Sequence, residues 1–243
     1  MSMENNNHSQ QYTGIVIHKE QLSPKVFSFD ISLKNPPAFQ FIPGQFVSVD
    51  VGNNKRRSYS IASSSYRVDG IKLIVDIAPG GSGSQYFSQL EVNQELSLKG
   101  PMGKFHLASE TGNIVFLAAG TGIAPFRSMI DYLIEKQISE NDHEVRSIYL
   151  YISFRFQEDI FWKEYFELLE CSTQNFHFLL TLSQPTVSWN GCQGYVQACM
   201  DRQLLKDTNS HFYICGGNSM VEGVRKFLRE ESVSEDHIHF EPF

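Results

Sequence analysis

The stretch Ile114-Val115-Phe116-Leu117-Ala118-Ala119-Gly120-Thr121-Gly122 decides the fold of the second half of this chain. Its six consecutive apolar residues are typical of a strand that is buried on both faces of a parallel sheet. After the glycines, apolar residues from Phe126 to Ile134 recur at helical spacing, so we expect a helix to begin there. Strand, glycine turn and helix together predict a βα unit.

This alternation of strand and helix repeats to the end of the chain. Further strands are expected at residues 148–154, 176–182, 212–214 and from 238, and further helices around residues 161–169, 196–205 and 220–228. Such a series predicts a doubly wound α/β parallel sheet.

Ligands of a doubly wound sheet bind beyond the carboxyl ends of its strands. Three of these ends carry unusual residues, namely Gly120-Thr121-Gly122, Ser153-Phe154-Arg155 and Cys215-Gly216-Gly217. The first allows a pyrophosphate to approach a helix N-terminus, although Pro125 replaces the last glycine of the G-x-G-x-x-G fingerprint. Glycines that serve only as caps and tight turns are the alternative interpretation.

The first half of the chain has a different period. From Tyr12 to about Leu107, apolar and polar residues alternate in short runs that proline and glycine interrupt. This pattern predicts a small antiparallel β-barrel or sandwich. We therefore expect two domains, at residues 12–108 and 109–243, after a flexible N-terminus at residues 1–11.

Two segments of the first half suit a ligand that has a phosphate and a flat ring. In an extended Arg56–Ser60 segment, Arg57 offers a donor fork to phosphate, Tyr59 offers an aromatic face, and the serines offer hydroxyls. The glycine-rich loop Gly80–Ser84 precedes an expected helical turn, so its backbone N–H groups can bind phosphate. A basic surface strand and a flexible hairpin loop are the alternatives.

Composition excludes several classes of protein. The 243 residues are 41% hydrophobic, which is enough for two domains with cores. The net charge of −7 argues against nucleic-acid binding, because the only tight basic cluster is Lys55-Arg56-Arg57. No apolar run approaches the roughly 20 residues that span a bilayer, and no signal-peptide pattern opens the chain. We expect a cytoplasmic, monomeric protein without membrane insertion.

The cysteines and histidines do not predict a metal site. Cys171, Cys192, Cys199 and Cys215 lack the spacing of a zinc site or an iron–sulfur cluster, so we expect reduced and mostly buried thiols. His237 and His239 alternate in the last expected strand, where solvated side chains are the better interpretation than a metal pair.

Six motifs, in order along nearly the whole chain, resemble those of the ferredoxin–NADP reductase family. They are Arg57-Ser58-Tyr59-Ser60, Gly81-Ser82-Gly83-Ser84, Gly100-Pro101-Met102-Gly103, Gly120-Thr121-Gly122-Ile123-Ala124-Pro125, Cys215-Gly216-Gly217 and Glu241-Pro242-Phe243. The resemblance implies an N-terminal antiparallel FAD-binding barrel and a C-terminal NAD(P)-binding α/β domain. The periodicity predicts the same division.

For the flavin, the resemblance implies FAD, with FMN as the alternative. It implies that Arg57 binds the flavin phosphates, Tyr59 lies against the isoalloxazine, and Ser60 lies near the flavin N5. The backbone around Ile74 and Asp76 would line the polar edge of the ring, and Ser82, Gly83 and Ser84 would form the loop that holds the pyrophosphate. Ser58 and Gly81 are the other residues implied to bind the cofactor.

For the pyridine nucleotide, the resemblance implies Gly120, Thr121, Gly122 and Pro125 at the pyrophosphate, with Thr121 also where the two domains meet at the flavin. Cys215, followed by Gly216 and Gly217, would lie beside the nicotinamide C4 and shape its contact with the flavin. Glu241 would be a carboxylate near the flavin that relays protons, and Phe243 would complete the cofactor site. The implied catalytic residues are thus Ser60, Cys215 and Glu241.

The nucleotide specificity stays open. Ser183-Gln184 stands where NADP-preferring members of the family often have Ser-Arg, which removes a cation and makes NADH a candidate beside NADPH. Arg155 remains available for a 2′-phosphate.

The leading functional hypothesis is an FAD-dependent NAD(P)H oxidoreductase. It would pass electrons to a separate acceptor such as a ferredoxin, a flavodoxin or an oxygenase component. One alternative is an NAD(P)H-flavin reductase that uses flavin as a substrate. Another is a flavin-binding electron-relay or regulatory subunit without nucleotide activity.

Overall fold

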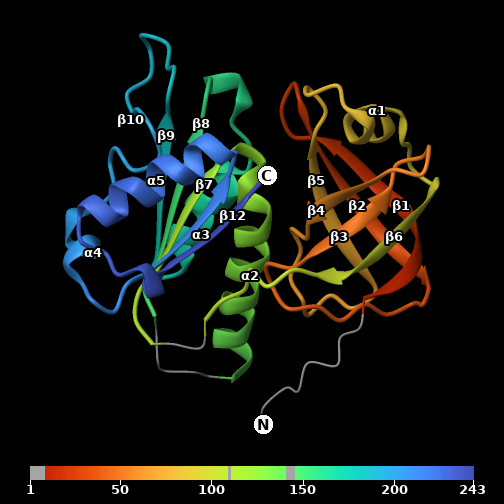
Figure 1. The fold of residues 1–243 in the computed structure, drawn as a ribbon, viewed down its shortest axis with the longest axis horizontal. Helices are drawn as coiled ribbons and strands as arrows, with labels where there is room; N and C mark the ends of the chain where they lie inside the picture. Colours follow the sequence, from red (N-terminus) through yellow and green to blue (C-terminus); the bar gives the residue numbers. More distant parts are fainter. Residues whose placement is uncertain (1–8, 109–110, 141–145) are drawn as a thin grey trace.

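The computed structural model describes residues 9–108, 111–140 and 146–243, which form two bodies that lie side by side (Figure 1). The predicted two-domain fold, an antiparallel barrel followed by a parallel α/β sheet, is confirmed. Residues 1–8, expected to be flexible, lie outside the described residues, and the first strand begins at Gln10. None of the described helices has the length and apolar character needed to cross a membrane.

The N-terminal body is a six-stranded antiparallel sheet that nearly closes on itself. Its strands are β1 (Gln10–Gln21), β2 (Val26–Asn35), β3 (Phe46–Asp50), β4 (Arg56–Ser60), β5 (Gly70–Asp76) and β6 (Glu95–Met102), in the order β4-β3-β6-β1-β2-β5. The two edges meet where Ile61 bridges Leu73 and the Ala62 N–H donates to the Lys72 carbonyl at 2.8 Å. Alternating inward residues fill the core, as the period of two predicts.

Helix α1 (Ser82–Gln89) covers one end of this barrel (Figure 1). Its Phe87 is fully buried between Phe29 and Tyr59, with ring centroids 5.0 and 4.8 Å away. The glycine-rich loop is therefore tied to strand β4 through aromatic packing.

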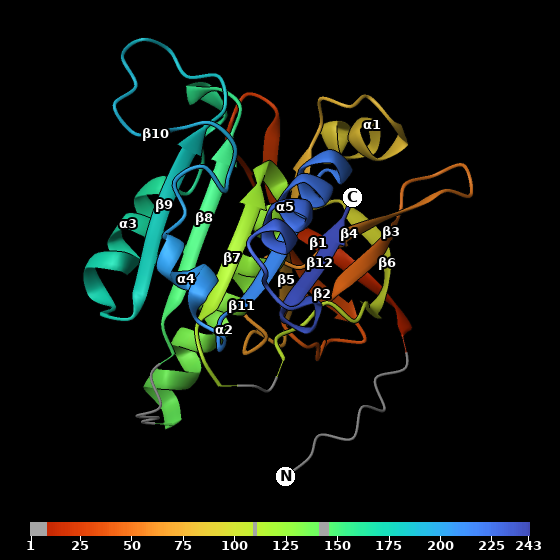
Figure 2. The same cartoon turned by 60° about the vertical axis from the view of Figure 1, so that its left-hand side comes forward.

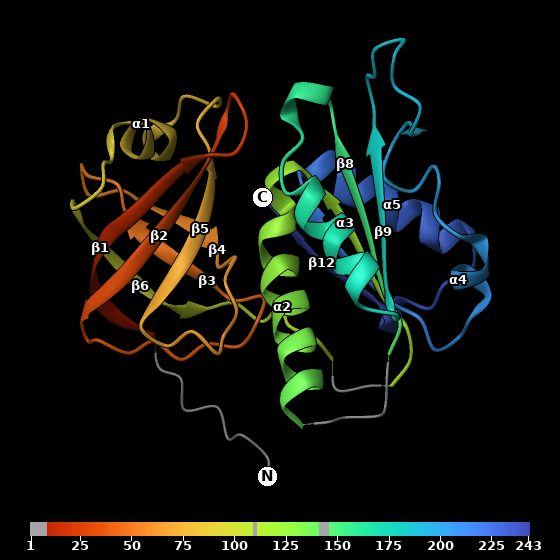
Figure 3. The ribbon, with the colours of Figure 1, turned by 180° about the vertical axis from the view of Figure 1, so that it is seen from behind.

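The C-terminal body is an all-parallel sheet in the order β10-β9-β8-β7-β11-β12. Its strands are β7 (Ile114–Ala119), β8 (Ile148–Phe154), β9 (Phe176–Leu182), β10 (Cys192–Gln193), β11 (His211–Gly216) and β12 (Ile238–Pro242). Helices α2 (Ile123–Glu140) and α3 (Lys163–Ser172) cover one face (Figure 3), and α4 (Arg202–Lys206) and α5 (Asn218–Glu230) cover the other (Figure 2). The sheet is doubly wound, and its strand order reverses between β7 and β11.

Helix α2 lies between the two bodies (Figure 1). Its Met129 and Ile130 share one apolar cluster with Val26, Ala62 and Ile74 of the barrel. The cores of the two domains are thus continuous at this seam.

Three local expectations are wrong. The predicted helix at residues 196–205 is limited to Arg202–Lys206, because turns occupy the preceding residues. Those turns bring the Cα atoms of Cys192 and Cys199 to 6.3 Å, and the two residues form a disulfide. Cys171 is exposed, so among the four cysteines only Cys215 is a buried thiol.

The histidines near the C-terminus are not simply solvated strand residues. The His239 ring stacks on Tyr213 with centroids 4.6 Å apart, and its Nε2 lies 3.3 Å from Nδ1 of His211. The His237 ring lies 4.3 Å from the His211 ring. His239 is half-buried because β12 pairs with the buried strand β11, which carries Tyr213 and His211. His237 lies outside the strand, in the 3-10 turn η3 (Glu235–His237), and is half-buried against the His211 ring.

Candidate functional site

The N-terminus of α1 and strand β4 form a cradle that fits a phosphate. The Ser82 hydroxyl is buried and has no hydrogen-bond partner among the described residues. A Cβ on Gly83 would lie 2.2 Å from the Tyr59 hydroxyl and 3.3 Å from Cγ of Arg57, so any larger residue would displace the Tyr59 side chain where loop and strand meet. A buried hydroxyl without a partner, beside the N–H groups of a helix N-terminus, suits a phosphate group. The structure thus brings together the two segments that the sequence singles out separately.

The side chains of β4 differ in their exposure to solvent and in their contacts. Arg57 is exposed, and its Nη1 donates to the Arg56 carbonyl at 2.8 Å; no carboxylate of the described chain lies within ion-pair distance. Burial raises the pKa of Tyr59 to about 12, so its phenol stays protonated. Ser58 is exposed and Ser60 half-buried. The strand therefore offers a free cation next to a neutral, packed aromatic ring.

Strand β5 connects this cradle to the second domain. Ile74 is buried in the seam, and Asp76 ends the strand with its Oδ1 accepting the Ala78 N–H at 2.8 Å. The Ser84 hydroxyl donates to the Asp76 carbonyl at 3.3 Å. Asp76 thereby contacts Ser84 at the end of the glycine-rich loop and also lines the cleft between the domains.

The glycine turn lies where the strand order reverses. Gly120–Gly122 form a 3-10 turn between β7 and α2, and Gly120 has a φ of +53°. A Cβ on Gly122 would lie 2.2 Å from the Cys215 carbonyl oxygen, so only glycine fits. The close approach of β7 and β11 therefore explains the second glycine, and the open backbone at the first leaves space for a ligand.

Cys215 and Glu241 lie side by side at the ends of β11 and β12, where they are register partners. Burial raises the pKa of Glu241 to about 7. Burial, together with the Glu241 charge, raises the pKa of the Cys215 thiol far above its usual value. Cys215 is thus a protonated packing residue, whereas Glu241 exchanges a proton near neutral pH.

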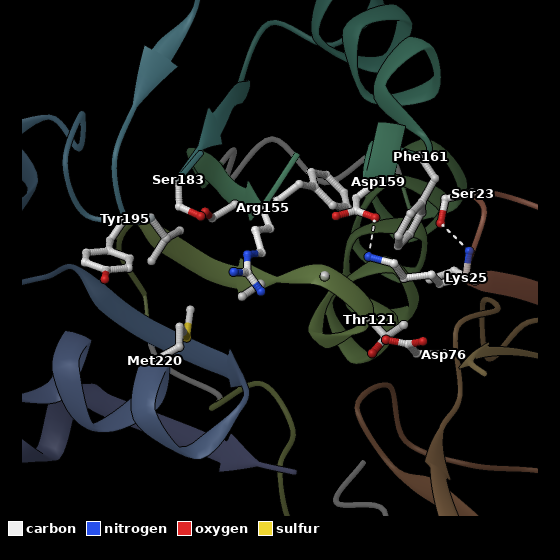
Figure 4. Close-up of a pocket in the computed structure, with 16 residues that line it drawn as sticks. Ser23, Lys25, Asp76, Thr121, Arg155, Asp159, Phe161, Ser183, Tyr195 and Met220 are labelled. Carbon is white, nitrogen blue, oxygen red and sulfur yellow. Dashed lines mark hydrogen bonds and ion pairs between the residues drawn. The ribbon is translucent and has the colours of Figure 1, made fainter. Parts of the chain in front are cut away.

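A cleft of about 380 Å³ lies between the barrel and the carboxyl ends of the parallel strands (Figure 4). It is lined by Ser23, Lys25, Val26, Asp76, Ala119, Gly120, Thr121, Ser153, Phe154, Arg155, Asp159, Phe161, Ser183, Tyr195, Val196 and Met220. The sequence predicts Asp76, Gly120, Thr121, Arg155 and Ser183 among these. Such a cleft at the switch point of a doubly wound sheet is the expected place for a dinucleotide.

Three further predicted residues, Pro125, Gly217 and Phe243, are not part of the cleft lining. Pro125 is buried in the first turn of α2, and Gly217 caps α5. The Phe243 side chain is 63% exposed, while its N–H donates to the Gly216 carbonyl at 3.1 Å. The hydrogen bond of Phe243 ties the residue after β12 to the end of β11.

Several residues that line the cleft are not predicted from the sequence. Lys25 belongs to the turn between β1 and β2, and its Nζ lies 3.1 Å from Oδ1 of Asp159 in the second domain. Tyr195 belongs to the turn that the disulfide closes, and Met220 to α5. No motif marks these positions, because the fold alone brings them to the cleft. Arg155, which also lines the cleft, donates a hydrogen bond from its Nε to Oε1 of Gln184 at 3.2 Å.

Both halves of the chain match family models. Residues 13–107 match a model described as an oxidoreductase FAD-binding domain, and residues 116–226 match one described as an oxidoreductase NAD-binding domain.

The chain matches some curated relatives over nearly their whole length and others over about two thirds of it or less. The chain is 33% identical to ferredoxin–NADP reductase B of Sorangium cellulosum, over 91% of this chain and 93% of the relative. It is 27% identical to the toluate 1,2-dioxygenase electron transfer component of Pseudomonas putida, over 96% of this chain and 67% of the relative. The anthranilate 1,2-dioxygenase electron transfer component of Acinetobacter baylyi is 26% identical over 84% of this chain, which spans 58% of that relative.

Solved structures share the fold. The cytochrome P450 reductase GcoB of Amycolatopsis superposes with a TM-score of 0.84 at 23% identity, over 98% of this chain and 71% of that chain. A ferredoxin NADP+ reductase from Neisseria gonorrhoeae with bound FAD and NADP gives a TM-score of 0.74 at 20% identity, over 96% and 98% of the two chains.

Proposed function

Because this chain belongs to the ferredoxin–NADP reductase family, and is an FAD-dependent NAD(P)H oxidoreductase, we propose that it delivers electrons from NADH or NADPH to a ferredoxin-type carrier protein. The relative that matches over 93% of its own length is named a ferredoxin–NADP reductase, which supports such a carrier. An oxygenase component is the other acceptor that the relatives' names suggest.

One observation supports this proposal most strongly. Asp76 accepts a hydrogen bond from the phosphate loop through its carbonyl and lines the interdomain cleft with its side chain. A flavin held by the α1 cradle and a nucleotide held at the glycine turn would therefore meet at the end of β5. Two redox partners held in contact react by proximity, without a strong general base.

At the flavin end, residues of the barrel would bind the cofactor. FAD, when bound, accepts hydride and returns electrons singly, which no side chain does. Arg57 supplies a cation to its phosphates, and the Ser82 hydroxyl with the first turn of α1 binds the pyrophosphate. Tyr59 orients the ring, while Ser60 donates a hydrogen bond at its reactive edge.

At the nucleotide end, residues of the second domain would orient the nicotinamide nucleotide, and one carboxyl group would exchange a proton. The N-terminal turn of α2 binds the pyrophosphate, and Arg155 is the cation nearest to Ser183 and Gln184 for a 2′-phosphate. Cys215 packs at the nicotinamide without reacting. Glu241 holds a proton below about pH 7 and releases it above, which suits exchange with solvent during turnover.

Anaerobic titration tests the proposal. We expect the purified holoprotein to keep stoichiometric FAD through dialysis, and NADH or NADPH to bleach its absorbance. The reduced protein should then reduce an added ferredoxin or flavodoxin at substoichiometric concentration. Loss of FAD on dialysis with rapid reduction of free flavin would favour a flavin reductase, and a bound flavin that neither nucleotide bleaches would refute the proposal.

A further inference from the structure

Lys25 is a cation that the barrel contributes to the nucleotide cleft. Its Nζ is 3.1 Å from Oδ1 of Asp159, which follows β8 in the 3-10 turn η2 (Gln157–Asp159). Figure 4 shows this ion pair at the end of the cleft where Thr121 and Asp76 lie, with Arg155 between it and Tyr195. The ion pair therefore joins the two domains beside the glycine turn.

Hydrogen bonds hold the backbone of Lys25, whereas its side chain is held by the Asp159 ion pair and its Nζ lies 5.9 Å from the centroid of the Phe156 ring. The Lys25 N–H donates to the Ser23 hydroxyl at 3.4 Å, and its carbonyl accepts the Ile77 N–H at 2.8 Å. The Lys25 side chain is 45% exposed, whereas that of Asp159 is 15% exposed. The ammonium group can therefore change partner while the turn stays in place.

The charges of the cleft give a reason for such a change. Among the described residues that line it, the cations Lys25 and Arg155 are balanced by the carboxylates Asp76 and Asp159. A dinucleotide brings a doubly charged pyrophosphate to the N-terminus of α2. Because a partly exposed ion pair is weak, the pyrophosphate competes well with Asp159 for the ammonium group.

We propose that Lys25 is a nucleotide-binding residue that leaves Asp159 for the pyrophosphate of NADH or NADPH. This inference rests on the proposed function, since it assumes that the cleft takes a pyridine dinucleotide. Both nucleotides carry the same pyrophosphate, so Lys25 strengthens their binding equally. One side chain of the barrel thus changes its ion-pair partner when a nucleotide occupies the cleft.

A permanent clasp between the domains is the competing interpretation, and the two make opposite predictions. If Lys25 binds pyrophosphate, Lys25→Gln weakens binding about ten-fold, the effect of losing one charge-assisted hydrogen bond. Asp159→Asn removes the competitor and a repelling charge, so it tightens binding by about two- to five-fold. If the pair is only a clasp, both variants weaken binding alike.

Calorimetric titration of the FAD-loaded protein with ADP-ribose measures this directly, because ADP-ribose carries the pyrophosphate but cannot reduce flavin. The KM values for NADH and NADPH provide the second readout. Lys34→Gln is the matched control: Lys34 is 48% exposed and pairs with Glu95 at 2.8 Å within the barrel. That control should bind ADP-ribose like the wild type.

The proposal is supported if Lys25→Gln binds ADP-ribose more weakly than the wild type and Asp159→Asn binds it more tightly. Each variant should also change the KM for NADH and the KM for NADPH by the same factor. Wild-type affinity in Lys25→Gln, or weaker binding in both variants, would overturn it while leaving the proposed function intact. A wild-type protein that binds no ADP-ribose and is reduced by neither nucleotide would refute the proposed function itself.

Discussion

Replacing Glu241 with glutamine is expected to stabilise the protein above neutral pH. Burial raises the pKa of this carboxyl from its ordinary 4.5 to about 7 in the folded protein. The folded state therefore binds more protons than the unfolded state between these values, and the contribution of Glu241 to stability falls as pH rises through them. Glutamine imitates the protonated carboxyl at every pH, so the variant escapes this loss.

The size of the effect follows from the pKa values. A carboxyl whose pKa moves from 4.5 to about 7 loses roughly 3 kcal/mol of folding free energy on ionising, at 1.36 kcal/mol for each pKa unit. Glu241 is only partly buried, and solvent screening reduces the expected difference to about 1–2 kcal/mol. Below about pH 4, under the unfolded-state pKa of 4.5, the two proteins should have equal stability.

Urea unfolding at a series of pH values, with FAD at one fixed concentration, measures the difference. Far-ultraviolet circular dichroism reports the transition. Exposed Glu230 on α5 provides the matched control variant, Glu230→Gln. Parallel stability profiles for Glu241→Gln and the wild type would refute a raised pKa at Glu241, and with it the proton exchange proposed for this residue.

Three further predictions follow from the site. Arg57→Ala should lose FAD on dialysis, whereas Ser60→Ala should keep it and slow flavin reduction in stopped-flow experiments; equal flavin content in Arg57→Ala and the wild type would contradict the first. Gly122→Ala should cost about 2 kcal/mol or more in urea unfolding, because its methyl group would meet the Cys215 carbonyl, and an unchanged midpoint would contradict this close approach. Arg155→Gln should raise the KM for NADPH more than that for NADH, and an equal change would show that Arg155 does not bind the 2′-phosphate.

Periodicity was enough to predict the architecture. The apolar run of β7 indicates a strand covered on both faces, and helices α2 and α5 do cover its two sides. Alternation in the first half predicts the barrel, because its strands bury one face only. The domain limits at residues 12–108 and 109–243 stay a prediction.

Local chemistry was predicted where it follows from backbone geometry. Only glycine fits at residue 122, because the turn after β7 passes close to the Cys215 carbonyl at the end of β11. A glycine motif after a buried strand predicts such a turn. Strand β10, with two residues, is too short to show a period, and the disulfide beside it depends on a turn that has no sequence signal. Lys25 reaches the cleft only because the barrel docks on the second domain.

That docking limits how freely the two halves can be exchanged between relatives. Val26, Ala62 and Ile74 belong to the first domain by sequence but pack in the same cluster as Met129 of α2. A chimaera that joins this barrel to the second domain of a relative would pack unmatched apolar side chains where the two domains meet. The glycine turn that precedes α2 would then shift together with the helix. Helix α2 is therefore the piece that a domain graft must carry across together with the barrel residues it touches.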